Sequence, residues 1–251
     1  MKTTPEAALD KITAWLAQLY GERLQSLVVY GSLAPGGNHD AQRSDINLLA
    51  VLDRLDAATL DLGAPAVQWW SAQGNPPLVM LARDEQNDAA EVFPIEYLDI
   101  QAHHRVLQGE DLFAQAPHFP EIHRRHVEHD LRAKLLRLRG AYMSVGHDAK
   151  KLEALLLDSS SAFLTLFRHA LVAVGEPMRV PKDEVLAAAA ARFHFAPAPF
   201  AAILGARRGG ARLEGGKLEA LRHLFAHYLA AIHQVESGLE DNGGSENRHE
   251  S

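Results

Sequence analysis

Two apolar runs separated by a polar segment constrain the fold of this chain more than any other feature. Residues 27–30 are β-branched or aromatic apart from one leucine and lead into Gly31, which predicts a buried strand that ends in a tight turn. Residues 45–52 have the composition of a second strand. Twelve residues separate Ser32 from Asp45, enough for a loop and a short helical turn. The sequence therefore predicts two buried strands joined by a polar connection.

The polar residues at the ends of these runs predict a site for a phosphate and a cation. Side chains alternate along a strand, so Asp45 and Asn47 project from one face, about 6.5 Å apart. Side-chain oxygens at that spacing suit Mg²⁺, which takes oxygen ligands. Gly31 allows the backbone to approach a phosphate closely, and the Ser32 hydroxyl can donate a hydrogen bond to it. Together they predict a Mg²⁺–nucleotide site.

This pattern resembles the nucleotidyltransferase motif of the DNA polymerase β superfamily. In that motif an apolar residue and Gly-Gly or Gly-Ser are followed, about a dozen residues later, by an Asp-apolar-Asp sequence. Here Gly31 and Ser32 are followed by Asp45 and Asn47. The sequence is most similar to bacterial aminoglycoside nucleotidyltransferase-like proteins, which join this core to a C-terminal helical domain. The resemblance implies that Gly31, Ser32 and Ser44 bind the triphosphate of an NTP, which we expect to be ATP.

The same resemblance implies an activity, and position 47 departs from it. The expected reaction transfers a nucleotidyl group from NTP–Mg²⁺ to a hydroxyl of a small-molecule acceptor. The second acidic position of the motif is Asn47, whose carbonyl can ligate Mg²⁺ but brings no negative charge, so it binds the ion more weakly than a carboxylate. A second interpretation therefore stays open: a catalytically degenerate nucleotide-binding, regulatory or interaction protein of the same fold.

A third carboxylate is expected from residues 92–100, which we predict to form another strand. Glu96 interrupts an apolar run there, and a buried carboxylate is costly unless it is paired or bound to a cation. The resemblance implies that Pro94 and Glu96 belong to the last catalytic strand, with Glu96 as a metal ligand and as the general base for the acceptor hydroxyl. Asp99 is the competing candidate, and a salt-bridged Glu96 without catalytic function is the alternative.

The patterns along the whole chain predict an α+β protein with two domains. Residues 1–115 fit a mixed-sheet nucleotidyltransferase core, with helices starting near residues 4 and 56 and a strand at residues 77–82. Two prolines between residues 114 and 120 mark a boundary. Residues 120–236 have the apolar spacing of a bundle of four or five helices. Residues 237–251 are rich in Gly, Asn, Glu and Ser, and we expect a disordered tail there.

Basic residues between positions 124 and 139 are a further candidate contact for the nucleotide. The resemblance implies that basic residues of the helical domain meet phosphates across a cleft between the domains, where the active site is expected. The alternative for most of them is a solvated helix face.

Composition limits the remaining function classes. The net charge is −7, which argues against nucleic acid as a partner, and the absence of cysteine excludes disulfides and thiol catalysis. The N-terminus lacks the apolar segment of a signal peptide. Residues 152–174 are apolar but include Asp158, Arg168 and His169, which favours a buried core helix over a membrane span. We therefore expect a cytoplasmic protein without a membrane partner, and the oligomeric state stays open.

Overall fold

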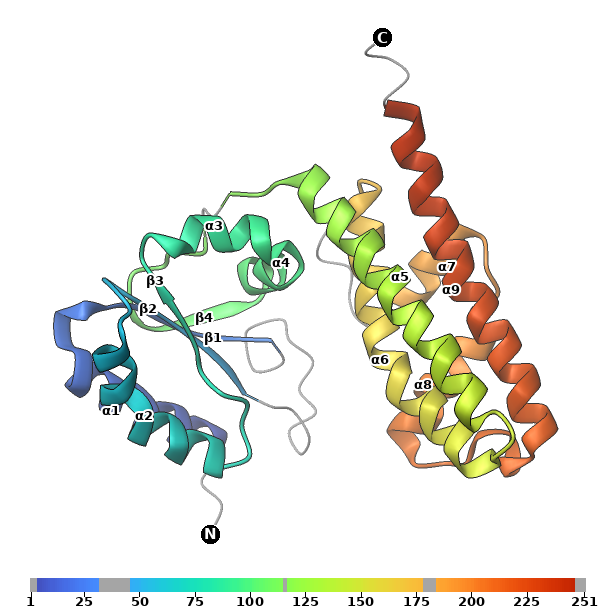
Figure 1. Ribbon diagram of the computed structural model, residues 1–251, viewed down its shortest axis with the longest axis horizontal. Coiled ribbons are helices and arrows are strands. Elements are labelled where there is room, and N and C mark those ends of the chain that lie inside the picture. Colours follow the sequence, from blue (N-terminus) through green and yellow to red (C-terminus); the bar gives the residue numbers. More distant parts are fainter. Residues whose placement is uncertain (1–3, 32–45, 115–116, 178–183, 247–251) are drawn as a thin grey trace. The chain divides into compact units, whose positions relative to one another are not determined.

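The computed structural model describes residues 4–31, 46–114, 117–177 and 184–246. The chain divides into two compact units, Met1–Phe119 (unit 1) and Pro120–Ser251 (unit 2). Unit 1 combines a sheet with helices, whereas the described part of unit 2 consists of helices (Figure 1). This confirms the predicted fold class, an α+β core followed by an all-α bundle.

A four-stranded mixed sheet forms the centre of unit 1, in the order β3-β2-β1-β4. Its strands are β1 (Leu24–Tyr30), β2 (Asn47–Leu52), β3 (Val79–Ala82) and β4 (His104–Gly109). Strand β1 is antiparallel to both β2 and β4, and β2 is parallel to β3. The strands predicted from the two apolar runs and from residues 77–82 are therefore present. Both faces of β1 are buried, which explains its continuous apolar sequence.

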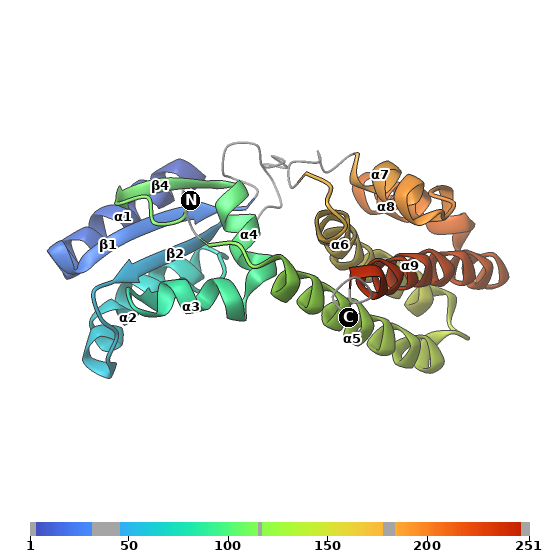
Figure 2. The ribbon, with the colours of Figure 1, turned by 90° about the horizontal axis from the view of Figure 1, so that it is seen from above.

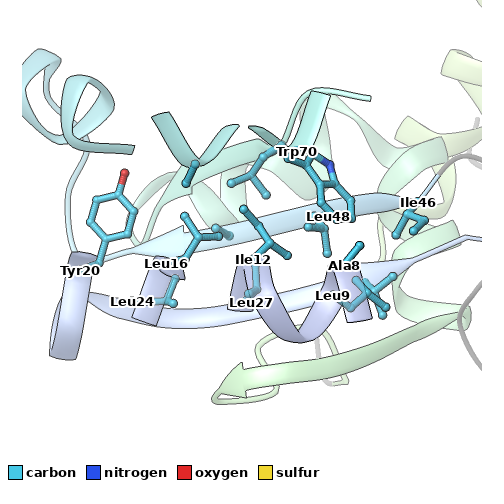
Figure 3. Close-up of a cluster of buried hydrophobic side chains, with 14 of the residues drawn as sticks. Ala8, Leu9, Ile12, Leu16, Tyr20, Leu24, Leu27, Ile46, Leu48 and Trp70 are labelled. Carbon is cyan, nitrogen blue, oxygen red and sulfur yellow. The ribbon is translucent and has the colours of Figure 1, made fainter. Parts of the chain in front are cut away.

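Helices cover the two faces of this sheet. On one face α1 (Pro5–Tyr20) and α2 (Ala57–Ala72) pack over alternate residues of β1 and β2. Figure 3 shows this core, in which Ile12 and Leu16 of α1 and Trp70 of α2 lie against Leu27 and Leu48. On the other face α3 (Glu85–Val92) and α4 (Pro94–Ala102) pack over the intervening strand residues. The side-chain period of two thus gives the sheet two separate cores.

Local signals set the ends of α1 and α2 where the sequence predicted them. The Thr4 hydroxyl accepts a hydrogen bond from the backbone N–H of Ala7 at 3.4 Å, and α1 ends at Gly21 with a positive φ of 55°. Helix α2 begins after Asp56, whose carboxylate accepts from the N–H of Thr59 at 2.7 Å. The short 3₁₀ helix η1 (Gly21–Arg23) connects α1 to β1.

The strand predicted at residues 92–100 is wrong, because this segment forms the end of α3 and most of α4. Pro94 occupies the first turn of α4, where its fixed φ suits a helix start and its missing N–H costs nothing. Ile95, Leu98 and Tyr97 are buried while Glu96 is exposed, which is a helical pattern and not an alternating one. The strand next to β1 comes instead from residues 104–109.

Unit 2 is arranged around α6 (Ala149–Ala173). This helix packs against α5 (Pro120–Val145), α7 (Val185–Phe193), α8 (Ala198–Gly209) and α9 (Leu218–Glu246). Figure 2 shows α5 on one side of α6, with α7 and α8 on the other. A second short 3₁₀ helix, η2 (Leu213–Gly216), precedes α9. In the part of the chain that the structure describes, five α-helices form this bundle.

The interior of unit 2 is aromatic. The Tyr228 ring of α9 contacts Phe163 of α6 and Phe200 of α8, and its hydroxyl lies 2.9 Å from the Ser159 hydroxyl. Burial raises the pKa of Tyr228 well above its usual value. Among the described helices, α6 alone is long and apolar enough to cross a membrane, with a mean hydropathy of 1.2. Half of that apolar stretch, 50%, is buried within the protein.

Helix α9 extends beyond the point at which we expected a disordered tail. It continues to Glu246, so residues 237–246 are helical. The reason is that its apolar stripe continues past residue 236, because Leu239 is fully buried. Gly238 also brings α9 close to α7, since a Cβ there would lie 2.5 Å from the Phe193 ring. The sequence did not predict this helical extension, because residues 237–246 are mostly polar or glycine.

Candidate functional site

The ends of three strands meet where the sequence predicted a site. In the sheet, Tyr30 at the end of β1 is paired with Asn47 on one side and with His104 on the other. Gly31 follows directly, and its backbone N–H donates a hydrogen bond to the carbonyl oxygen of His103 at 3.3 Å. The register therefore places Gly31 and Asn47 next to each other at one end of the sheet.

Backbone conformation and packing both require glycine at position 31. Its φ of +83° is a backbone conformation that side chains with a Cβ rarely adopt. A Cβ at this position would also lie 3.1 Å from the side-chain nitrogen of Asn47, closer than an ordinary contact. The Asn47 side-chain nitrogen thus lies next to Gly31. Gly31 and Asn47 are the two predicted site residues whose contact the structure describes.

Glu96 lies on α4 and not on a strand. It is exposed in the first turn of that helix, where a negative charge suits the positive end of the helix dipole. Burial raises the pKa of Tyr30, and the negative charge of Glu96 raises that pKa further. The charge of Glu96 therefore acts on Tyr30, the cross-strand partner of Asn47.

The competing carboxylate, Asp99, lies on the same helix. Because α4 is helical, Glu96 and Asp99 are about 60° apart around its axis, whereas a strand would have turned them to opposite faces. Asp99 is half-buried, and its carbonyl oxygen accepts a hydrogen bond from the N–H of His103. Glu96 and Asp99 therefore lie on the same face of α4. Of the two carboxylates, only Glu96 is a cause of the raised pKa of Tyr30.

The other predicted site residues cannot be placed. Ser32, Ser44 and Asp45 lie outside the described residues. None of the four described strands contains Asp or Glu, so a carboxylate for this site has to come from elsewhere in the chain. The described residues also include no group of three His, Asp or Glu that could hold a metal ion.

Tyr30 and His104 adjoin this site although sequence reasoning assigned them no role. The His104 ring lies 2.8 Å from the carbonyl oxygen of Ile100 and 2.9 Å from the Asp111 carboxylate. The ring of His104 thus lies between two hydrogen-bond acceptors. Tyr30 was recognisable as the last residue of an apolar run, but His104 gave no signal because its strand was not predicted.

Hydrogen bonds hold Asp111 in its charged form. Burial acts to raise the pKa of Asp111, but hydrogen bonds from His104 and from the N–H groups of Ala114 and Phe113 outweigh it and lower the pKa. The segment after β4 is thereby tied to the strand end that carries Tyr30.

Basic residues of α5 are engaged within unit 2. Arg124 pairs with Glu121 and Glu128 on its own helix. Arg132 pairs with Glu236 and Glu240 of α9. The predicted contact between basic residues of this helix and phosphates stays a prediction.

Comparison with known proteins identifies the fold. No model of a protein family matches the chain, and no curated protein does. Among solved structures, it is similar to the spectinomycin adenyltransferase AAD(9) from Enterococcus faecialis, whose crystal structure contains ATP and spectinomycin. The two are 16% identical and align with a TM-score of 0.59 over 95% of this chain and 100% of the other.

The chain has a nucleotidyltransferase fold. The resemblance expected from Gly31, Ser32, Asp45 and Asn47 is confirmed at the level of fold by a structure that aligns along almost the whole chain. A likeness at this identity establishes the fold alone, since one fold can support different functions.

Proposed function

We propose that this protein is a nucleotidyltransferase that moves a nucleotidyl group from an NTP, expected to be ATP, to a hydroxyl of a small-molecule acceptor. The observation that carries the proposal is the meeting of Gly31, Asn47 and the charge of Glu96 at one end of the sheet, in a chain with this fold. The similar AAD(9) structure contains ATP and spectinomycin, which supports a nucleotide and a small molecule as the two substrate classes.

The proposed roles follow from the chemistry of each residue. Gly31 leaves open the space that a Cβ would fill, so a phosphate can approach the backbone there, with Ser32 and Ser44 as hydroxyl donors. Glu96 is exposed, and as a carboxylate it can accept the proton that the acceptor hydroxyl loses. Its negative charge also acts on Tyr30, at the end of β1.

The oxygen donors fit a hard cation. Asp45 and the amide oxygen of Asn47 would hold Mg²⁺, with Glu96 as the third ligand. Bound Mg²⁺ would lower the charge repulsion between the attacking oxygen and the α-phosphate. The neutral Asn47 predicts weaker binding of the ion than a carboxylate would give.

A pyrophosphate-release assay tests the proposal. The full-length protein is incubated with ATP, Mg²⁺ and a panel of hydroxyl-bearing small molecules that includes spectinomycin. We expect Mg²⁺-dependent release with at least one acceptor, and loss of that release in Asp45→Ala. Asp53→Ala is the matched control, because Asp53 follows the other end of β2 and pairs with Arg23. Release that survives in Asp45→Ala would refute the assignment of the site.

The second candidate is a protein that binds nucleotide without transferring it. Two observations favour it: Asn47 stands where the motif has a second acid, and none of the described strands carries a carboxylate. This candidate predicts ATP binding without pyrophosphate release for any acceptor. Asn47→Asp separates the two, because restoring the carboxylate should tighten Mg²⁺ binding if position 47 faces the ion. Unchanged Mg²⁺ binding would show that it does not.

A further inference from the structure

Two histidines form a close pair on the exposed face of α9. His223 and His227 are four positions apart, so their side chains lie on neighbouring turns of the same helix face. Their Nε2 atoms are 3.0 Å apart. The ring centroids are 4.5 Å apart, and the ring planes are nearly perpendicular, at 85°. Both residues are exposed, so the two nitrogens are accessible from solvent.

We propose that His223 and His227 bind a divalent transition-metal ion with a preference for right-angled ligands, Cu²⁺ or Ni²⁺. An imidazole nitrogen lies about 2.0–2.1 Å from such an ion, so two of them at a right angle are ~2.9 Å apart, whereas a tetrahedral angle separates them by ~3.3 Å. The observed 3.0 Å lies between these two values and is nearer to that of the right angle. Tetragonal coordination by nitrogen is typical of Cu²⁺ and Ni²⁺, and Cu²⁺ is the more strongly bound of the two.

The backbone that carries the pair is held firmly. Leu224 and Phe225, which lie between the two histidines in sequence, are buried, and so is Tyr228. The Phe225 ring stacks on Tyr142 of α5 with centroids 4.0 Å apart and planes at 10°. This packing fixes the helix turn, so binding would cost little more than the freedom of two exposed side chains.

The surroundings leave room for the remaining ligands. The exposed neighbours of the pair on α9 include Ala226 and Ala230, whose small side chains leave space for water on the ion, and Glu219, one turn before His223. The nearby guanidinium of Arg222 is directed to α5, where its Nε donates to the Tyr142 hydroxyl at 3.3 Å. Its positive charge is thus turned toward α5. In the absence of metal, 3.0 Å also suits an N–H···N hydrogen bond between the rings, which the ion would replace.

Copper titration of the full-length protein tests this site. CuCl₂ is titrated into wild type, His223→Ala and His227→Ala. Calorimetry measures the Cu²⁺ affinity, and electron paramagnetic resonance detects nitrogen ligands on the bound ion. The chain has 14 histidines, so His129→Ala serves as a control at an exposed histidine of α5. Alanine is favourable at exposed helix positions, and circular dichroism of each variant confirms the fold.

We expect the tightest Cu²⁺ equivalent to show two nitrogen ligands in the wild type and in His129→Ala. Each of the two α9 variants should weaken it by about tenfold or more, because loss of an outer-shell partner alone costs that much. Copper affinity and nitrogen coupling unchanged in both α9 variants would overturn the proposal. An equal loss in His129→Ala would also overturn it, since the pair would then not be the specific site.

Discussion

At the scale of single residues, the site depends most on Gly31. Its positive φ and its closeness to Asn47 exclude a Cβ for two independent reasons, one in the backbone and one in packing. The sequence predicted the glycine from its place after an apolar run, and the structure adds the contact with Asn47. Because Gly31 and Asn47 lie next to each other, a substitution at Gly31 should displace Asn47, and the loss of stability can be measured.

Gly31→Ala is expected to destabilise unit 1 by about 1–2 kcal/mol from backbone strain alone, with a further cost from displacing Asn47. Gly74→Ala is the matched control, because Gly74 has a similar φ of +91° but nothing lies within 4 Å of its added Cβ. Urea unfolding followed by tryptophan fluorescence reports unit 1 only, since Trp15, Trp69 and Trp70 all lie there. Equal losses in the two variants would show that the Asn47 contact has no energetic weight.

Asp111→Asn should change the pH dependence of stability. The folded state lowers the pKa of Asp111, so its contribution is present above about pH 4, the ordinary Asp value, and is lost as the pH falls through the folded pKa. At neutral pH we expect a loss of no more than about 1 kcal/mol, because the carboxylate is partly exposed and water screens it.

The measurement for Asp111 is the urea midpoint of unit 1 between pH 7 and pH 3. The difference between wild type and Asp111→Asn should shrink toward acid. Asp61→Asn, at an exposed position of α2, is the control and should show no such trend. A difference that stays constant over this pH range would contradict the role given to the carboxylate.

At the scale of elements, the sequence identified α1, α2 and the strands β1, β2 and β3, but not α4 and β4. Strong local signals mark the first group, such as the Thr4 and Asp56 caps and the continuous apolar runs. The segment around Glu96 carries Pro, β-branched and aromatic residues that suit either structure, and short apolar runs do not distinguish a helix from a strand. The tertiary contacts of Tyr97 and Ile100 with the sheet decide in favour of the helix.

This error moved the expected general base, Glu96, from a strand to the first turn of α4, and its role stays a prediction. On a strand, Glu96 would have pointed to the face opposite Ile95, whereas on α4 it is an exposed residue of the first helical turn. The motif residues near Asn47 were predictable because their spacing lies within one short segment. The approach of Glu96 to Tyr30 was not, since it depends on how α4 packs against the sheet.

The packing of α1 on α2 gives a prediction at this scale. A Cβ at Gly63 would lie 2.1 Å from the hydroxyl oxygen of Tyr20, which itself donates to the carbonyl oxygen of Thr59 at 2.9 Å. Gly63→Ala should therefore destabilise unit 1 by about 1–3 kcal/mol through overpacking. Adding Tyr20→Phe removes the obstructing oxygen, so the double variant should lose less than the sum of the two single losses.

The free energy of unfolding of unit 1 is measured by tryptophan fluorescence in urea for wild type, Gly63→Ala, Tyr20→Phe and the double variant. These four values complete the double-mutant cycle. Additive losses would contradict the close contact between Gly63 and the Tyr20 hydroxyl.

At the scale of the whole molecule, the sequence predicted the fold class from the order of its elements and from one short motif. The similarity to AAD(9) along 95% of the chain confirms the fold at an identity of only 16%. The sequence did not predict the acceptor. Acceptor binding depends on side chains from separate elements, and no local sequence pattern shows which of them lie close together.

The most direct test of the central claim is a calorimetric titration of the full-length protein with ATP, in the presence and absence of Mg²⁺. The account predicts binding at a single site that Mg²⁺ strengthens, and loss of this Mg²⁺ effect in Asp45→Ala but not in Asp53→Ala. Absence of ATP binding in both conditions would contradict both the transferase and the nucleotide-binding interpretation of this site.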